Sequence, residues 1–367
     1  FNLAANYDLL YRPRYIQERG FLHQGKFRWL SEEAGYWEFD GGWIGDDSKY
    51  EDEFPLEDGS RWLVGTKHNG RFGDHWHTYI NYTRVSDTEY LRDLNNSNLS
   101  AQRETALQQL ARLAWINDQW QVTLDFEQFQ SIAEDIAEDY RKLPQMTARW
   151  TGDREWMGGT PIFLSQLSYF DSDVQRVTGQ RLYNEIGLTK PMNWTAGFFT
   201  PTVKYRSVNY ELDRPFTQLD TSPSAGSLMT SLDGGLIFER QTSLFGQSMT
   251  QTLEPRVYYL YSQYEEQRYQ PDFDSAELTF SYGQLFRDTR FSGNDRLDDA
   301  NQLSVGVTSR YFDNETGEEK LSASLGQIYY FRDQEVRLNP GDPVLAEATS
   351  PLAAEFTWSP GQKWKLR

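Results

Sequence analysis

Three histidines lie close enough in the sequence to suggest a metal site. His75 and His77 are two residues apart, so they share one face of the strand predicted around them, and His68 stands in the preceding strand. A zinc site needs three or four protein ligands, and no carboxylate stands at a ligand-like spacing from this pair. We therefore predict no metal, and expect His75 and His77 to be polar side chains facing a lumen or solvent.

A charged pair, Glu254 and Arg256, has the same two-residue spacing on the polar face of a predicted strand at 249–263. The plainest interpretation is an ion pair or ion network inside the fold. The alternative is a charged lining that guides a polar cargo. Pro255 between them is awkward in this strand, because proline removes a ladder hydrogen bond.

No catalytic motif stands out. The chain has no G-x-S-x-G, no G-x-x-x-x-G-K-[ST] and no H-E-x-x-H sequence. The acidic stretch 46–60 lacks the spacing of an EF-hand loop, so we expect a solvated loop that cannot be a buried element. A carboxylate pair for glycoside hydrolysis stays open among 54 acidic residues. We predict no catalytic residue and no cofactor.

Composition narrows the class of protein. The net charge of −18 disfavours nucleic acid, because phosphate binding requires a basic face. Aromatic residues make up 15% of the 367 residues, which is expected where aromatic girdles mark two membrane interfaces. No apolar run is long enough for a membrane-spanning helix, but a transmembrane β-strand needs only about ten residues with every second one apolar.

The elements that position these residues are alternating strands, and 302–331 shows the pattern best. Leu303, Val305 and Val307 alternate with polar residues, FDNETGEEK follows, and Leu321 and Leu325 continue the alternation. This predicts an antiparallel hairpin with one apolar face. A charge at Val305 should cost about 2–4 kcal/mol at a bilayer midplane, and Ser304 on the other face should tolerate it.

Connections alternate in length along the chain. SEEAG, GRFGD and Asn117-Asp118 are short, whereas 46–60, 86–103 and 131–142 are long and polar. Short turns on one side of a meander and long loops on the other are typical of transmembrane barrels. The early turn QERG (17–20), which is short on the long-loop side, is an exception. We predict an all-β, antiparallel up-and-down transmembrane β-barrel segment of about 17 strands. The segments 104–116 and 131–140 also have helix-forming composition; the position of 104–116 before a two-residue turn favours a strand there.

Several segments together resemble the LptD family of lipopolysaccharide-assembly outer-membrane proteins. They are NYDLLYRPRYIQERG (6–20), FRWL (27–30), NYTRVSDTEYLRDL (81–94), QTLEPRVYYLYSQY (251–264), LFRDTRFSGNDRL (285–297), ANQLSVGVTSRYF (300–312) and LSASLGQIYYF (321–331). The resemblance implies a 26-stranded barrel of which this chain is a single-domain central part, residues 1–367. An N-terminal periplasmic jelly roll, the last strands and the family's disulfide cysteines have no counterpart here.

The resemblance also implies function, location and partners. Lipopolysaccharide would be inserted into the outer leaflet of the Gram-negative outer membrane, and no bond chemistry is involved. The partners would be lipopolysaccharide, the plug lipoprotein LptE, the periplasmic bridge protein LptA through the jelly roll, and membrane lipids. The residues expected to face the lumen are Arg12, Arg14, His75, His77, Glu254, Arg256, Ser304 and Arg310. Those expected to face lipid are Leu303, Val305, Val307, Leu321 and Leu325.

Two other classes stay open on the pattern alone. One is a different outer-membrane barrel, such as a porin or a plugged transporter. The other is a soluble all-β glycan-binding protein or hydrolase. Alternation and sorted loops favour a membrane barrel over the soluble class, and only the family segments favour lipopolysaccharide transport over another barrel.

Overall fold

The computed structural model describes residues 1–94, 105–133, 140–173, 177–214, 220–244, 246–361 and 364–366. These form two compact units. The first comprises residues 1–150, 166–181 and 212–215, and the second comprises 151–165, 182–211 and 216–367. Each unit is all-β, with two short α-helices in the first and a 3₁₀ helix in the second.

The described residues of the first unit form β1 to β8 and all of β9 except Thr151, in chain order, and the strands from β2 to β9 have 10 to 12 residues each. Its elements are β1 (Asn2–Ala4), β2 (Tyr7–Ile16), β3 (Gly20–Ser31), β4 (Gly35–Ile44), α1 (Ser48–Glu53), β5 (Arg61–Phe72), β6 (Trp76–Val85), α2 (Tyr90–Leu94), β7 (Ala106–Ile116), β8 (Trp120–Ser131) and β9 (Arg141–Thr151). Three further strands have residues in both units: β10 (Thr160–Asp171), β11 (Thr178–Thr189) and β13 (Gly197–Asp213).

The second unit contains the remaining elements. They are β12 (Met192–Trp194), β14 (Ser224–Leu236), β15 (Phe238–Leu244), β16 (Gln247–Ser262), the 3₁₀ helix η2 (Tyr282–Phe286), β17 (Ala300–Asp313), β18 (Glu319–Tyr330), β19 (Ala353–Gly361) and β20 (Trp364–Leu366). The described residues thus hold twenty strands. Three of them have only three residues, which leaves seventeen longer ones and agrees with the predicted number.

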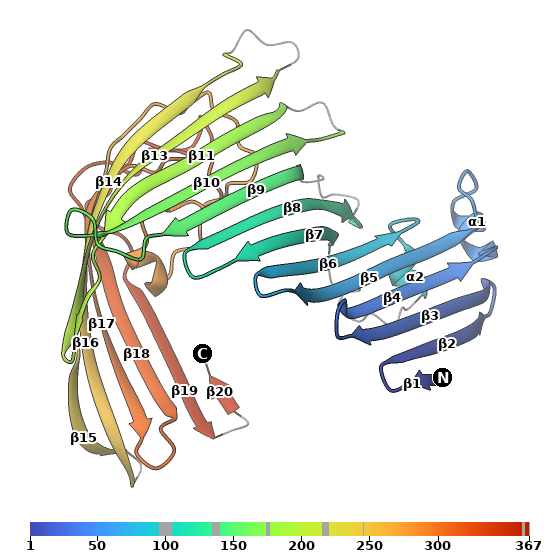
Figure 1. Cartoon of the computed structure of the whole chain (residues 1–367), viewed down its shortest axis with the longest axis horizontal. Coiled ribbons are helices and arrows are strands. Elements are labelled where there is room, and N and C mark those ends of the chain that lie inside the picture. Colours follow the sequence, from blue (N-terminus) through green and yellow to red (C-terminus); the bar gives the residue numbers. More distant parts are fainter. Residues whose placement is uncertain are drawn as a thin grey trace. The chain divides into compact units, whose positions relative to one another are not determined.

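Strands of the first unit pair antiparallel with their sequence neighbours from β1 to β9, and β2 to β8 lie side by side in chain order (Figure 1). The connections 32–34, 73–75 and 117–119 are short, while those after β4 and β6 are long and carry α1 and α2. The predicted sorting of loop lengths is confirmed for these five connections. The turn 17–19 is the expected exception, because it is short and lies beside α1. The described part of the predicted segment 104–116, residues 105–116, contains strand β7 and no helix, so the position in the meander outweighed helix propensity.

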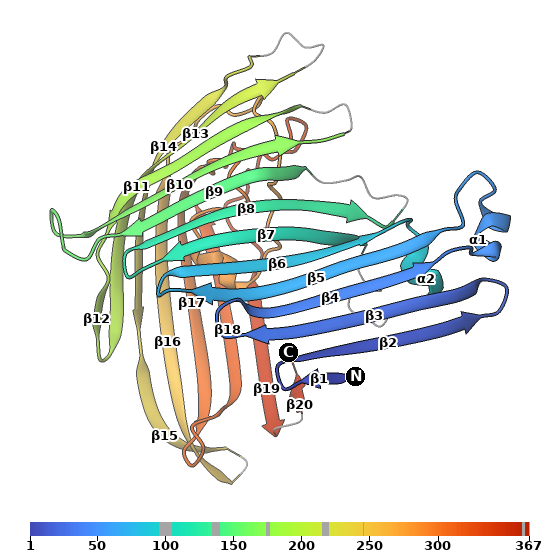
Figure 2. The same cartoon turned by 45° about the vertical axis from the view of Figure 1, so that its right-hand side comes forward.

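In the second unit, β13, β14, β16, β17, β18 and β19 form an antiparallel series, and the last four lie side by side in Figure 2. The predicted 302–331 hairpin is confirmed, with Leu303 opposite Tyr329 and Val307 opposite Leu325. On one edge, β16 pairs with β15 up to Leu253 and with β14 from Arg256 onward. Pro255 lies in the gap between these two pairings. The proline thus stands at an interruption of that ladder.

Side-chain burial is the reverse of that in a water-soluble protein, because polar side chains of the sheet are buried and apolar ones are exposed. Along β17 and β18, Ser304 and Thr308 are buried, whereas Val305 is 40% and Leu325 is 45% exposed. In the first unit, Val64 is 51% exposed, while Gln24 and Asp125, on the other face of the sheet, are buried. Each sheet therefore has one exposed apolar face and one covered polar face. None of the helices in the described ranges is long and apolar enough to cross a membrane.

One prediction about the loops is wrong. The stretch 46–60 was expected to hold no buried element, but it contains α1, and Asp47 and Tyr50 are buried. Asp47 caps the helix by accepting a hydrogen bond from the Tyr50 backbone N–H. Its charge is tolerated because two arginines neutralise it. Most of the predicted second helical alternative, 131–140, lies outside the described residues.

Candidate functional site

The polar face of the first unit is a ladder of cross-strand ion pairs. Lys26 Nζ lies 2.9 Å from Glu38 Oε1 and 3.2 Å from Asp40 Oδ1, both on the neighbouring strand. Arg112 and Asp125 make a two-bond pair between β7 and β8, at 2.7 and 2.9 Å. Opposite charges facing each other across strands stabilise the pairing and leave a hydrophilic surface.

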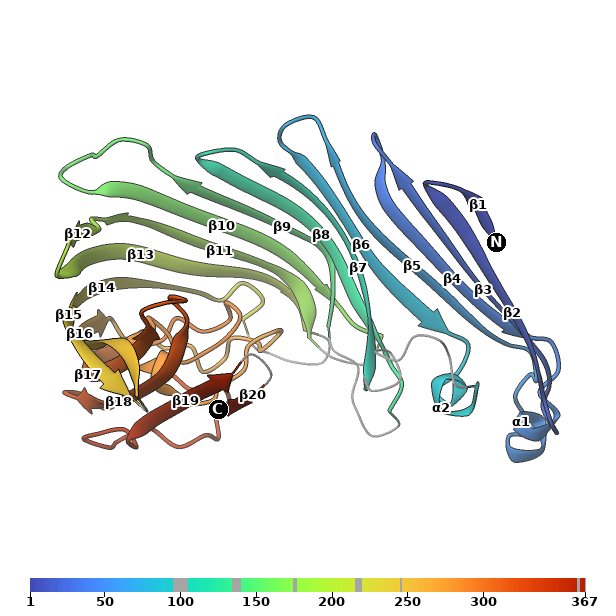
Figure 3. The ribbon, with the colours of Figure 1, turned by 90° about the horizontal axis from the view of Figure 1, so that it is seen from below.

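Helix α2 packs against an apolar patch at one end of this polar face. Leu22, Ile44, Leu63 and Val85 share that face by register. They form a buried cluster with Tyr90, Leu91 and Leu94 of α2. Figure 3 shows α1 and α2 at the same end of the strands they connect. In the described part of the connection after β6, α2 therefore lies on the polar face.

Arg61 links the two connections that contain α1 and α2. Its guanidinium makes ion pairs with Asp47 before α1, with Asp87 before α2 and with Asp93 in α2, at 2.7, 2.7 and 3.1 Å. Arg19 also bridges Asp47 and Asp93. Arg61 has no exposed surface and lies 4.1 Å from the centre of the Tyr50 ring. We call these charged residues with α1 and α2 the α1–α2 cluster. Burial raises the pKa of Tyr90 within it, so that phenol stays neutral.

In the second unit, two long connections cover the polar face of β16 to β18. We call residues 263–299 and 331–352 the cap. Helix η2 of the cap lies directly on the sheet at Gly306 and Gly326, which face each other across β17 and β18. A Cβ at Gly306 would come within 2.8 Å of Phe286 and Tyr282, and one at Gly326 within 2.5 Å of Leu285. Only glycine permits this close approach.

Three buried aspartates organise the cap. Asp295 accepts hydrogen bonds from the backbone N–H groups of Phe273 and Asp274, and Asp299 accepts from those of Glu335 and Val336. Asp298 binds the Arg290 guanidinium at 2.9 Å. Between them, Arg296 donates to five backbone carbonyls, including those of residues 337 and 338. The two connections are thereby joined into one folded piece.

The cap is also joined to the sheet by charge. Lys204 of β13 lies 3.0 Å from Asp288 and 3.4 Å from Glu185. Burial raises the pKa of Asp288, but Lys204 and Arg206 more than offset this and hold it below its usual range. Asp288 therefore stays ionised at neutral pH. Arg206 also donates to the Asp298 backbone carbonyl at 3.0 Å.

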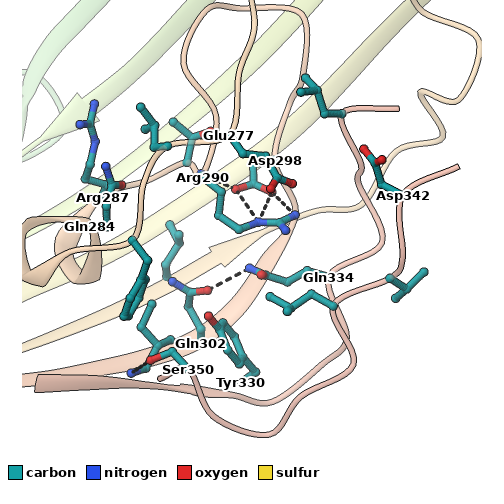
Figure 4. A pocket seen from close by; sticks show the side chains of 18 of the residues that line it. Glu277, Gln284, Arg287, Arg290, Asp298, Gln302, Tyr330, Gln334, Asp342 and Ser350 are labelled. Carbon is teal, nitrogen blue, oxygen red and sulfur yellow. Dashed lines mark hydrogen bonds and ion pairs between the residues drawn. The ribbon is translucent and has the colours of Figure 1, made fainter. Parts of the chain in front are cut away.

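The cap and the strands beneath it line a partly open cavity of about 590 Å³ on the polar face (Figure 4). Strand residues Leu260, Gln302 and Ile328 form its floor. The cap supplies its walls, including Leu278, Arg290, Gln334, Leu338 and Leu345. Among the residues that the structure describes, no group of three or more His, Asp or Glu side chains could hold a metal ion.

The structure places seven of the eight residues predicted to face the lumen on polar faces. Arg12 and Arg14 lie on the polar face of β2, and His77 on that of β6. Glu254, Arg256, Ser304 and Arg310 share the polar face of β16 and β17. His75 lies in the turn before β6, where Nδ1 is 3.0 Å from the Ile116 carbonyl oxygen. His68 is on the opposite face from His77, between Trp37 and Thr78, so the three histidines do not meet.

Glu254 and Arg256 do not pair with each other. Arg256 binds Asp233 of β14 through two hydrogen bonds of 2.9 and 2.6 Å. Glu254 lies 3.3 Å from Arg310 of β17, which also binds Glu319. Residues two apart on a strand are farther from each other than from their cross-strand neighbours. The network expected inside the fold therefore runs across the strands.

The five residues predicted to face lipid share the exposed apolar face of β17 and β18. They are Leu303, Val305, Val307, Leu321 and Leu325. Ser304, on the other face, is fully buried, and its hydroxyl has no hydrogen-bond partner among the described residues. The expected tolerance of Ser304 to charge must therefore be withdrawn, because the new charge would be buried without a partner.

Sequence reasoning missed the cap and the α1–α2 cluster. The stretch 264–301 shows no apolar periodicity in the sequence, because its structure depends on hydrogen bonds between side chains and backbone. A cue was present in RDTRFSGNDRLDD (287–299), where arginines and aspartates are interleaved around a glycine. Gly293 has a φ of +66°, which favours glycine at that turn.

Comparisons with known proteins agree with this architecture. The sequence model of the LptD family, described as LPS transport system D, matches residues 59–367. The LPS-assembly protein LptD of Hahella chejuensis is 37% identical over the whole chain, and that of Pseudomonas syringae pv. tomato is 34% identical over 98% of it. The LptD protein of Pseudomonas aeruginosa LESB58 is 35% identical over 93%. The chain spans 47%, 42% and 40% of these relatives. These matches show that the chain belongs to the LptD family.

Proposed function

We propose that this chain forms part of the wall of an outer-membrane β-barrel that delivers lipopolysaccharide to the outer leaflet. The observation that carries the proposal is the reversed burial of both units. Their apolar side chains are exposed on one face, and their charged side chains are paired on the other. An exposed apolar face of this extent is unfavourable in water and favourable against lipid.

The polar face suits the cargo. Lipopolysaccharide has a large, phosphorylated head group and apolar acyl chains. Drawing the head group through hydrocarbon would be costly, whereas a lumen lined by Lys26, Glu38, Asp125 and similar residues offers hydrogen bonds. We propose that residues 1–367 belong to one barrel domain, with the polar face as its lumen.

The name shared by the relatives, LPS-assembly protein, supports lipopolysaccharide as the cargo. We also propose the plug lipoprotein LptE as a partner inside the lumen and the bridge protein LptA as the periplasmic donor. Membrane lipids would contact the face that carries Leu303, Val305, Val307, Leu321 and Leu325. The protein would act as a translocon and not as an enzyme.

Depletion of the full-length protein in cells tests the proposal. We expect lipopolysaccharide to disappear from the surface of intact cells, as measured with an antibody against its polysaccharide, and to return when the wild-type gene is supplied. Unchanged surface lipopolysaccharide after depletion would refute the transport function. Recovery of the full-length protein in the aqueous fraction without detergent would refute the membrane location.

A further inference from the structure

Strand β15 has one unpaired edge. β16 pairs with β15 and then with β14 in one unchanged register, interrupted only around Pro255, so β14 and β15 act as one long strand. On the other edge of this long strand, β13 begins at Gly197, opposite Leu236. β15 therefore continues past the end of β13, and Figure 2 shows it extending below β12. Among the described residues, β16 is the only strand that pairs with β15.

The alternation of backbone groups shows which residues of β15 are unpaired. The Ile237 N–H donates to the Ala196 carbonyl oxygen at 2.8 Å, so the backbone groups of Ile237 face β13. In an antiparallel sheet, every second residue directs its N–H and its C=O to the same side. Glu239, Gln241 and Ser243 therefore face the open edge, and no backbone group within the described ranges bonds to them there. All three residues are exposed.

The open edge is regular as well as unpaired. The seven residues of β15 span about 23 Å. Edge strands are commonly protected by a proline, a bulge, a covering loop or charged side chains. β15 has no proline and no bulge, and its register with β16 does not shift. Free N–H and C=O groups along such a strand are the features to which an extended peptide adds as a further strand.

The charges on this edge favour a basic partner residue. Glu239 is exposed and makes no ion pair within the part of the chain that the structure describes. Arg240 points to the opposite face, where its Nε donates to Gln251 Oε1 at 2.7 Å. Residues directly opposite each other on antiparallel strands interact, and opposite charges are favourable. An added strand would therefore carry a lysine or arginine opposite Glu239 and uncharged residues opposite Gln241 and Ser243.

We propose that the open edge of β15 is a docking site for an extended peptide segment of a partner protein, which adds as an antiparallel strand and places a basic residue opposite Glu239. A second copy of the chain fits less well. Two copies in one membrane would direct their β15 strands the same way, whereas an antiparallel partner strand runs the opposite way. The site goes beyond the proposed delivery of lipopolysaccharide and does not depend on the cargo.

Synthetic peptides test the proposal on the full-length protein in lipid nanodiscs. The probe is a fluorescent peptide of sequence TVTVKV, whose two threonines and lysine are to pair with Ser243, Gln241 and Glu239. Fluorescence anisotropy should show saturable binding. Replacing the lysine by glutamate should weaken binding about fivefold, because like charges then face each other. N-methylation of the threonines and the lysine removes the three N–H groups that face β15 and should weaken binding at least tenfold. N-methylation of the three valines, whose N–H groups face away, is the matched control and should leave binding unchanged.

Three variants locate the site. Glu239→Lys should reverse the preference, so that the glutamate peptide binds more tightly than the lysine peptide. Gln241→Pro removes an N–H of the open edge that does not bond to β16, and should weaken binding of the lysine peptide about tenfold. The control is Glu315→Lys, which makes the same change of charge in the exposed turn between β17 and β18. It should keep the preference for the lysine peptide.

The proposal fails if the peptide methylated on its threonines and lysine binds as tightly as the probe, because binding would then not use the backbone. It also fails if binding does not saturate, or if Glu239→Lys keeps the preference for lysine. Cross-linking of two copies through Gln241→Cys, with no binding of the peptide, would make a second copy the occupant and overturn the proposal. None of these outcomes bears on lipopolysaccharide delivery, which the depletion experiment measures separately.

Discussion

Arg61 shows how one side chain determines the fold of two loops. It has no exposed surface and compensates three carboxylates that belong to the connections around α1 and α2. A buried ion network adds little stability compared with an apolar core, but removing one member leaves the others charged and unpaired. The α1–α2 cluster should therefore be sensitive to this one residue, although neither helix exceeds six residues.

Arg61→Gln should release both helical connections together, because Asp47, Asp87 and Asp93 lose their common partner. We expect destabilisation of about 3–5 kcal/mol. Hydrogen exchange should accelerate in residues 45–60 and 86–94 and stay slow in the middle of β5. Arg28→Gln is the control, since Arg28 makes a solvent-screened pair with Asp8 that should contribute little to stability. Equal exchange in the two variants would contradict the role of Arg61.

Asp288 should make attachment of the cap depend on pH. Its folded pKa lies below the ordinary aspartate value, so the ion pair with Lys204 stabilises the cap above the unfolded pKa of about 3.9. This contribution is lost as the pH falls through the lower, folded pKa. Exchange protection of residues 285–298 should fall below about pH 4. Asp288→Asn should remove this part of the pH dependence, and an identical pH profile for both proteins would rule the mechanism out.

At the scale of elements, the strands were predictable and the loops were not. The alternation of Leu303, Val305 and Val307 is a local pattern, and it set the faces of β17 correctly without any tertiary information. Helices α1 and α2 have no such pattern, because helices this short are stabilised by the contacts of Tyr50, Tyr90 and Leu91. The partners of Glu254 and Arg256 could not be predicted either, since strand register is needed to find Arg310 and Asp233.

Leu325 and Ser324 are adjacent in β18 and point to opposite faces, which makes them a matched pair. Leu325→Lys places a charge on the apolar face and should cost about 2–4 kcal/mol near a bilayer midplane. Ser324→Lys places the same charge on the polar face opposite Glu355. It removes the hydrogen bond between Ser324 and Thr308, so the expected loss is about 1 kcal/mol, smaller than for Leu325→Lys. Unfolding of the purified protein by urea in lipid vesicles measures both. Equal losses would argue against the assignment of the faces.

Gly326 tests how closely η2 approaches the sheet. A Cβ there would lie 2.5 Å from Leu285 Cδ1 and 2.7 Å from the Val305 carbonyl oxygen, so Gly326→Val should displace η2 at a cost of about 1–3 kcal/mol. Gly41→Val is the control, because a Cβ at Gly41 meets no atom within 4 Å. Limited proteolysis within 263–299 should speed up only in Gly326→Val. Similar rates in both variants would show that the close contact is unimportant.

At the scale of the whole molecule, the fold and the family both support a β-barrel wall with one face toward lipid and one toward a polar lumen. Both units expose apolar side chains on one face and pair charged side chains on the other, and the LptD family model matches residues 59–367. The strands also have lengths suited to a bilayer, with 10 to 12 residues each from β2 to β9. The proposed transport of lipopolysaccharide through a polar lumen requires this orientation of the faces.

Spin labels on single cysteines introduced into residues 1–367, which contain no cysteine, test that orientation most directly. Any cysteines elsewhere in the full-length protein are kept as disulfides or replaced by serine. Positions 64 and 325 lie on the apolar face, and position 121 is an exposed site on the polar face. In the full-length protein in lipid bilayers, labels at 64 and 325 should collide with dissolved oxygen and be shielded from a water-soluble nickel complex. The label at 121 should show the reverse. If labels at 64 and 325 were exposed to the nickel complex, the proposed orientation of the faces would be wrong, whether position 121 lay in lipid or in water.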